Sequence, residues 1–302
     1  MRIRFNSIFA INFIILLGSI PLILSTGHNG FLLWSFRRQF LTLAFSVLGV
    51  SFEMLGGMPD LAFSAEIAAA TCIGAVFMKN GAPIPFALLM MLLMLLLSGA
   101  VKALLVSYVR INPLITTFAL SYIISGIGTA VLDDGVIGIN SMRLYFYSGV
   151  WDLLFILFFL CLGFSCLVMT KTYLGRYVRM LGEDESVLRQ SGMSVFRIRL
   201  LINSIAAVFY LISAIIYLLI TSSGSMYNGI NSTYRILGAV FLSGIGFMTG
   251  KGNLLFCFLG TSVIVALEII ATEFRLPYYC INLLMGIIII LCCMGEIHKN
   301  RR

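Results

Sequence analysis

The chain has few charged residues and almost no histidine. Only 11% of its 302 residues are charged, where soluble globular domains usually have about 25%, and its two histidines are His28 and His298. So few histidines argue against a metal site of the common kinds. No Ser/His/Asp or Cys/His group stands at a spacing suited to nucleophilic catalysis. We therefore expect a chain that is not an enzyme and binds no cofactor or metal.

The cysteines form no Cys-x-x-Cys pair, and each lies in an apolar stretch. The seven are Cys72, Cys161, Cys166, Cys257, Cys280, Cys292 and Cys293. Cysteine in such surroundings behaves as a small apolar side chain, so we expect packing rather than disulfides or metal ligation.

Long apolar runs dominate the chain, since 60% of its residues are hydrophobic. A continuous run of about 20 apolar residues crosses a bilayer as a helix, whereas a barrel would show short alternating segments. The runs predict an all-α integral membrane protein with about ten transmembrane helices in a single polytopic domain, residues 1–302. They lie near residues 7–24, 40–56, 60–78, 84–106, 113–131, 150–169, 200–221, 236–248, 254–271 and 278–295.

The basic residues indicate an orientation. With a cytoplasmic N-terminus, 14 of the 20 basic residues fall on the cytoplasmic side, Lys102 among them. The others are Arg37, Arg38, Lys79, Arg143, Arg235 and Arg275. Cytoplasmic loops carry an excess of Lys and Arg, so both termini are predicted to be cytoplasmic. The net charge of +8 then reflects orientation in the membrane more than nucleic-acid binding, so we expect membrane lipid and not nucleic acid as a partner.

The largest break between the apolar runs is a basic loop at about residues 170–199. Gly182 precedes the segment Glu183-Asp-Glu-Ser-Val-Leu-Arg-Gln-Ser191, and Gly192 follows it. Acidic residues at a helix start and a glycine just past its end are typical of a short helix, here of about two turns. A helix that short is marginal in water and has to pack against something. A solvated connector that only sets topology is the alternative.

Three segments carry a resemblance to a known family. They are Gly56-Gly-Met-Pro-Asp-Leu-Ala-Phe-Ser64, the loop Leu174 to Val195, and Ile236 to Gly252, which ends Thr-Gly-Lys-Gly. In the same order they are similar to the Gly-Gly-Ile-Asp-Leu-Ser motif, the coupling loop and the Gly-Gly-Lys-Gly segment of ATP-binding-cassette (ABC) importer permeases for ribose and related monosaccharides, relatives of the branched-chain amino acid permeases. Arg110 to Leu120 is a weaker fourth match.

The chain departs from the family's pattern in a few places. Glu183 stands where the family has Asn, Ser186-Val187 where it has Ala-Ala, and Pro59 where it has an aliphatic residue. These changes bear on the identity of the ATPase and of the solute.

The resemblance implies a permease subunit that forms the pathway for a small hydrophilic solute, a monosaccharide or sugar-like molecule. The implied partners are ABC ATPase subunits, a second permease subunit of the same or a sister chain, and an extracytoplasmic solute-binding protein. The implied location is the bacterial cytoplasmic (inner) membrane. Permeases for branched-chain amino acids or nucleosides share this architecture and remain alternatives. The implied ATPase-coupling residues are Gly182, Glu183, Asp184, Glu185, Ser186 and Gly192.

Polar residues inside the predicted spans are candidates for the solute pathway. They are Asp60, Glu66, Thr117 and Ser121. Ionisable groups in a membrane are costly and usually functional, and Glu66 lies deeper in its span than Glu53 or Glu268. Asp60 could instead cap a helix, and the hydroxyls could serve helix packing. An ion-coupled secondary transporter, using Asp60 or Glu66, is the rival from another class.

The segment Gly250-Lys251-Gly252 resembles part of a phosphate-binding loop. That motif requires Gly at position 245 and Ser or Thr at position 252, where this chain has Ile245 and Gly252. We expect a tight turn, with Gly246 and Gly250 allowing close helix approach, and ATP hydrolysis on a separate subunit.

Overall fold

The computed structural model describes residues 29–132, 136–139, 148–228, 232–246 and 250–300, most of which are helical. The α-helices are α2 (Asn29–Leu55), α3 (Phe63–Lys79), α4 (Ile84–Leu104), α5 (Pro113–Val131), α6 (Ser148–Lys171), α7 (Tyr173–Glu183), α8 (Glu185–Gln190), α9 (Val195–Thr221), α10 (Thr233–Leu242), α11 (Cys257–Glu273) and α12 (Tyr278–Asn300). A π-helical turn, η1 (Leu105–Val109), extends α4, and a 3-10 turn, η4 (Leu254–Phe256), precedes α11.

Nine of the predicted spans coincide with described helices in the same order, and the span at 7–24 lies outside the described residues. In the described part of the chain, five segments are long and apolar enough to cross a membrane: Ile84–Val109, Pro113–Val131, Gly149–Lys171, Val195–Thr221 and Leu254–Glu273. Helix α10 has only ten residues. That is a length of about 15 Å, half of a hydrocarbon core of about 30 Å. Ten full crossings therefore remain a prediction.

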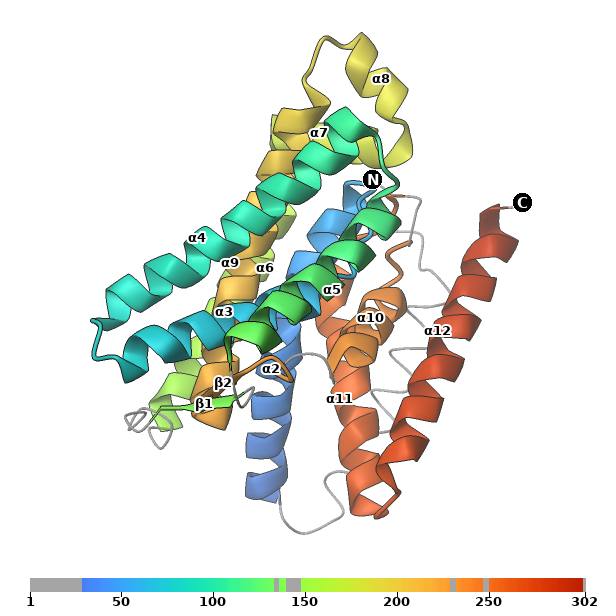
Figure 1. Cartoon of the computed structure of the whole chain (residues 1–302). Coiled ribbons are helices and arrows are strands. Elements are labelled where there is room, and N and C mark those ends of the chain that lie inside the picture. Colours follow the sequence, from blue (N-terminus) through green and yellow to red (C-terminus); the bar gives the residue numbers. More distant parts are fainter. Residues whose placement is uncertain (1–28, 133–135, 140–147, 229–231, 247–249, 301–302) are drawn as a thin grey trace.

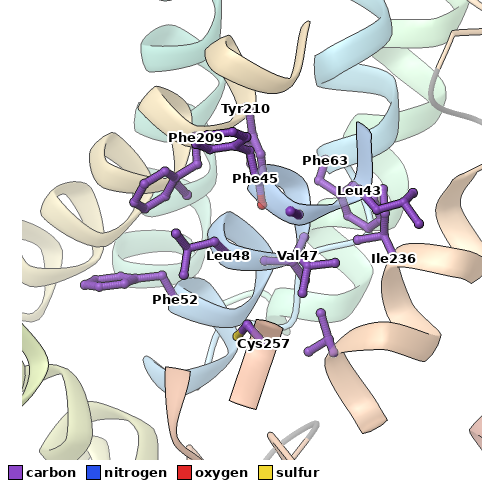
Figure 2. Close-up of a cluster of buried hydrophobic side chains, with 14 of the residues drawn as sticks. Leu43, Phe45, Val47, Leu48, Phe52, Phe63, Phe209, Tyr210, Ile236 and Cys257 are labelled. Atoms are coloured by element: carbon purple, nitrogen blue, oxygen red, sulfur yellow. The ribbon is translucent and has the colours of Figure 1, made fainter. Parts of the chain in front are cut away.

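Helix α2 forms the centre of the fold. Its side chains from Phe40 to Leu55 are buried almost without interruption, apart from Thr42. A helix that is apolar on every face is one that other helices surround. Figure 2 shows its Phe45 beside Phe209 and Tyr210 of α9, and its Val47 on the side that faces Ile236 of α10. Helices α6, α9, α10 and α11 all pack against it.

Helices α4, α5 and α6 are peripheral and expose large apolar side chains. Leu97 of α4, Ile127 of α5 and Leu160 of α6 are each more than 60% exposed in the isolated chain. In a bilayer such faces contact lipid or another membrane chain, because hydrocarbon is as apolar as leucine.

The fold also contains a small sheet, which the all-α prediction missed. Strands β1 (Val136–Gly138) and β2 (Ser223–Ser225) pair antiparallel, with Ile137 opposite Gly224. Gly224 lies against α3, where an added Cβ would come within 2.5 Å of the Thr71 carbonyl oxygen. Glycine is therefore needed here for close approach, and three-residue strands without alternating apolar residues leave little signal in a sequence.

The helices fall into a clear arrangement relative to the loop between α6 and α9. Figure 1 shows α7 and α8 together at one end of the molecule, and α2 running from the opposite end toward them. Helix α12 runs back toward the end that holds α7 and α8. This arrangement is the one expected if the C-terminus and the loop lie on the same side of a membrane.

Candidate functional site

The loop between α6 and α9 contains two helices rather than the single one predicted. Helix α7 is amphipathic: Val178 and Leu181 are buried, while Arg176 and Arg179 are exposed. The spacing of Leu174, Val178 and Leu181 is the i, i+4, i+7 pattern of a helix face. This pattern could have predicted α7 from the sequence, but the many charged residues of the loop made the apolar spacing easy to miss.

Helix α8 confirms the predicted short helix, although it begins at Glu185 and has only six residues. The Asp184 side chain caps it by accepting a hydrogen bond of 2.8 Å from the Ser186 backbone N–H. Gly192 follows its end with a φ of +76°. Leu188 anchors the buried face. Ser186, Val187 and Arg189 of α8 are exposed, as are Glu183 at the end of α7 and the cap residue Asp184.

An ionic contact holds α8 to the start of α9. The Arg199 guanidinium is buried and donates to Glu185 Oε2 at 2.7 Å and to Ser107 Oγ of η1 at 3.2 Å. Arg189 donates to the other oxygen of Glu185. Partial burial opposes ionisation of Glu185, but the hydrogen bond from Arg189 and the charge of Arg199 outweigh it and lower its pKa. Hydrogen bonds with Ser186 lower the pKa of Asp184 as well.

A contact between three glycines holds the end of α7; we call it the glycine junction (Gly57, Gly182 and Gly250). A Cβ added at Gly182 would lie 2.3 Å from the Leu55 carbonyl oxygen and 2.9 Å from Gly250 Cα. Gly57 and Gly250 have φ values of +67° and +59°, which favour glycine. Gly182, one of the predicted coupling residues, is buried at this contact, and its role in coupling remains a prediction.

The glycine junction joins the three segments that carried the family resemblance. Gly57 comes from the segment that begins at Gly56, Gly182 from the loop, and Gly250 from the segment that ends at Gly252. Close approach at Gly250 confirms that part of the sequence interpretation. Gly246 donates its N–H to the Lys251 carbonyl oxygen at 2.9 Å, and the tight turn expected between them falls on residues 247–249, outside the described residues.

A buried ionic cluster lies next to the Gly56-Gly57 turn; we call it the Lys102 cluster (Lys102, Glu53, Asp60 and Glu66). The Lys102 ammonium donates to Glu53 Oε1 at 3.1 Å, to Asp60 Oδ2 at 2.9 Å and to Glu66 Oε2 at 3.2 Å. All four side chains are at most 2% exposed. The ammonium thus gives one hydrogen bond to each of three carboxylates from different parts of the chain.

Two hydroxyl groups complete the Lys102 cluster. Tyr210 of α9 donates to Glu53 Oε2 at 2.7 Å, and Ser98 of α4 donates to Glu66 Oε1. Asp60 Oδ1 accepts the Ala62 backbone N–H at 2.7 Å. Buried charges are tolerated when they are paired and hydrogen-bonded in this way. The cluster therefore ties α2, α3, α4 and α9 together around the turn.

The Lys102 cluster tests several interpretations of the sequence. Asp60 belongs to a buried polar site, but the cap alternative was wrong: Ala62 is the N-cap residue of α3 and has no side-chain cap, and Asp60 accepts only the N–H of Ala62, just before the helix. Glu66 does make the expected buried contact. Lys102, which the orientation count placed on the cytoplasmic side, is 1% exposed and paired with carboxylates inside the fold. Glu53, which the sequence ranked below Glu66 as a candidate for a buried contact, is as buried as Glu66.

Thr117 and Ser121 do not join the cluster. Thr117 Oγ1 donates to the Pro59 carbonyl oxygen at 3.3 Å and so fastens α5 to the turn. Ser121 donates to the Phe118 carbonyl oxygen of its own helix at 2.7 Å. The Thr117 contact joins two segments as a packing hydroxyl does, whereas the Ser121 contact stays within its own helix. A pathway role for either residue remains a prediction.

Two further features lie outside the cluster. Glu268 of α11 forms a bidentate ion pair with Arg235 of α10. Cys72, Cys161, Cys166, Cys257 and Cys280 are free thiols, as the sequence indicated. The side chains of the other two cysteines lie outside the described residues.

Comparison with known proteins gives these features a context. The sequence model of a family described as branched-chain amino acid transport system permease component matches residues 32–293. The autoinducer 2 import system permease protein LsrD of Escherichia coli K12 is 25% identical over 248 residues, covering 76% of this chain and 71% of that protein. LsrD of Yersinia pestis Pestoides F is 25% identical over 272 residues, covering 85% and 80%. Comparison with solved structures gives no significant match.

Proposed function

The chain belongs to the family of branched-chain amino acid transport system permease components, and on that premise we propose that it forms the solute pathway of an ABC importer. The observation that carries the proposal is the pair of helices α7 and α8, which presents a polar face outward while its other face is fixed to the membrane helices. A docking element has to combine these two properties, because a partner can move the membrane helices only through a rigid attachment.

The exposed face of α8 is the proposed docking surface for the ATPase. Glu183, Asp184, Ser186 and Val187 are accessible there. Beside it lies a cavity of about 500 Å³ lined by Arg110, Asn112, Pro113, Glu185, Ser186 and Arg189, among others. A concave, charged surface next to a projecting helix suits a protein partner of complementary shape.

The proposed solute is small and hydrophilic, a monosaccharide or sugar-like molecule. Two lines support it: the similarity of three segments to monosaccharide permeases, and relatives that carry the name of autoinducer 2 import permeases. Branched-chain amino acids and nucleosides remain the alternative solutes. An uptake panel of radiolabelled ribose, autoinducer 2, leucine and adenosine would separate them.

The Lys102 cluster weighs against the ion-coupled alternative. Asp60 and Glu66, the carboxylates that would carry a coupling proton or sodium ion, surround an ammonium that already supplies the positive charge. The Lys102 ammonium is part of the chain, so it cannot cross the membrane as a coupling ion would. Energy is therefore proposed to enter through α7 and α8 and not through these carboxylates.

The proposed assembly contains a second permease chain, two ATPase subunits and an extracytoplasmic solute-binding protein, in the bacterial inner membrane. The exposed apolar faces of α4 and α5 support contact with lipid and with a second chain. Both termini and the loop are proposed to be cytoplasmic, which agrees with the direction of α12 in Figure 1.

Co-purification from membranes tests the proposal. The tagged native chain should bring its ATPase through mild detergent, and Glu183→Arg with Val187→Arg should abolish that association. The matched control is Glu273→Arg with Phe274→Arg, which alters an exposed acid and an exposed apolar residue at the distal end of α11 and should leave association intact. If the native chain brings down no ATPase but moves solute down an ion gradient alone, the importer assignment fails.

A further inference from the structure

We infer that Gly57, Gly182 and Gly250 are positioning residues that pass movement of α7 and α8 to the helices joined by the Lys102 cluster. The inference rests on the proposed function, because an ATPase has to move α7 and α8 for the contact to matter. It assigns the transmission of that movement to three backbone positions and one lysine.

The first step is the stiffness of the glycine junction. An added Cβ at Gly250 would lie 2.6 Å from Gly182 Cα, and one at Gly57 would lie 3.0 Å from the same atom. The backbone of Gly182 therefore touches those of Gly57 and Gly250 without side chains between them. Packed protein interiors transmit strain because they are close to incompressible. A displacement of Gly182 cannot be absorbed by a change of side-chain rotamer at this contact.

The second step is the turn that Gly57 occupies. The N–H groups of Gly56 and Met58 both donate to the Glu53 carbonyl oxygen, at 3.0 and 3.1 Å. Glu53 at one end of this turn and Asp60 at the other both accept from the Lys102 ammonium. The turn is thus a closed unit, fastened to α4 at both ends. A displacement of Gly57 should therefore also displace Lys102, which is bound to Glu53 and Asp60 on either side of the turn.

The third step is helix α9, which contacts the loop at its start and the Lys102 cluster further along. Arg199 at its start holds Glu185 of α8 at 2.7 Å, and Tyr210 three turns later holds Glu53 at 2.7 Å. Since both contacts belong to one helix, α9 shifts with the loop and with the cluster together. Helices α3, α4 and α9 then respond as one body to a movement that begins at α8.

The experiment uses the complete importer in proteoliposomes, with ATP hydrolysis and solute uptake measured on the same sample. Gly182→Ala should retain the bound ATPase and its hydrolysis, while uptake per ATP falls about tenfold. Gly163→Ala is the matched control, because this helical glycine of α6 has no atom within 4 Å of an added Cβ. It should leave uptake per ATP unchanged.

A second pair keeps the test decisive if Gly182→Ala does not fold. Gly57→Ala adds a milder contact at a positive φ, and Gly244→Ala adds the same backbone strain, at a φ of +72°, with no atom within 4 Å. Only Gly57→Ala should reduce uptake per ATP.

The outcomes separate the inference from the proposed function. Normal uptake per ATP in Gly182→Ala and Gly57→Ala overturns the inference. So does a loss of ATPase binding in parallel with uptake, because the glycines would then serve only to build the docking surface. If the native chain itself binds no ATPase, the proposed function is wrong, and the native chain and all variants will alike show no ATP-dependent uptake.

Discussion

Replacing Lys102 with methionine should destabilise the protein more than any other single removal of a charge in the described chain. Methionine keeps most of the volume of the lysine stem and removes the ammonium. Three carboxylates, from α2, the turn and α3, then face one another without a cation at distances set for hydrogen bonding to it. The folded state loses the positive charge that pairs with all three carboxylates, while each carboxylate stays out of water.

The magnitude follows from the geometry. Each Lys102 contact is 2.9 to 3.2 Å long, and two unit charges at that distance attract by about 5 kcal/mol at an effective dielectric constant of about 20. Desolvation and repulsion among the carboxylates oppose most of the summed attraction. Truncating one partner of a buried ionic group usually costs about 3–5 kcal/mol, and we expect a loss of this size in the free energy of unfolding.

The assay is unfolding of the purified protein in mild detergent, followed by circular dichroism. Lys79→Met is the matched control, because Lys79 is exposed at the end of α3, and it should change stability by less than about 1 kcal/mol. Replacing all four groups together (Lys102→Met, Glu53→Gln, Asp60→Asn, Glu66→Gln) should recover part of the loss, since the uncompensated charge is gone. Equal stability of Lys102→Met and Lys79→Met would refute the reasoning.

Three further predictions concern the loop and helix α10. Because the pKa of Glu185 is lowered in the folded protein, its contribution to stability is complete above the ordinary glutamate pKa of about 4.3 and is lost as the pH falls below that value. Hydrogen exchange of α8, corrected for intrinsic rates, should show this pH dependence. The Glu185→Gln variant should show none. Leu188→Ala should cost about 2–5 kcal/mol, because the side chain is fully buried, and limited proteolysis of the loop should accelerate, whereas Val187→Ala on the exposed face should have little effect. Gly260→Ala should push α10 away from α11, because the new Cβ would meet the Ala239 carbonyl oxygen, and the thermal stability of the protein should fall. The control Gly286→Ala places its Cβ in open space and should leave thermal stability unchanged.

The helices were largely predictable because long apolar runs have a direct physical cause. A segment such as residues 84–106 or 200–221 has to satisfy its backbone internally in lipid, so it forms a helix regardless of its neighbours. Boundaries were less accurate where a helix continues past the apolar run. Helix α2 begins at Asn29, well before the predicted residue 40, because α2 includes the polar stretch around Arg37, which pairs with Asp152 of α6.

The candidate site was only partly predictable, because its members are brought together by tertiary packing. Asp60 and Glu66 were found as carboxylates within apolar runs, which is a local signal. Lys102 gave the opposite signal, since a lysine near the end of an apolar run normally reaches toward water. Three buried carboxylates require a cation, and that requirement could have directed attention to Lys102. Its spacing of four residues from Ser98, on one helix face, points the same way.

The glycine junction shows what a sequence leaves out. Gly57, Gly182 and Gly250 were each noticed within a local motif, where glycine serves turns and helix ends. Their mutual contact joins positions more than 60 residues apart and leaves no periodic pattern. Only the three-dimensional structure identifies them as one feature.

The shortness of α10 bears on how the chain enters the membrane during synthesis. From Ile236 to Leu242 every residue of α10 is buried, and it packs against α2, α11 and α12. Ten residues are too few to partition into a bilayer alone, where about 20 are needed. When a ribosome has released α10 but not yet α11 and α12, two of its three packing surfaces do not exist. Helix α10 should therefore reach its place only after α11 and α12 have been inserted, so the fold around α2 is completed by helices that follow α10 in the chain.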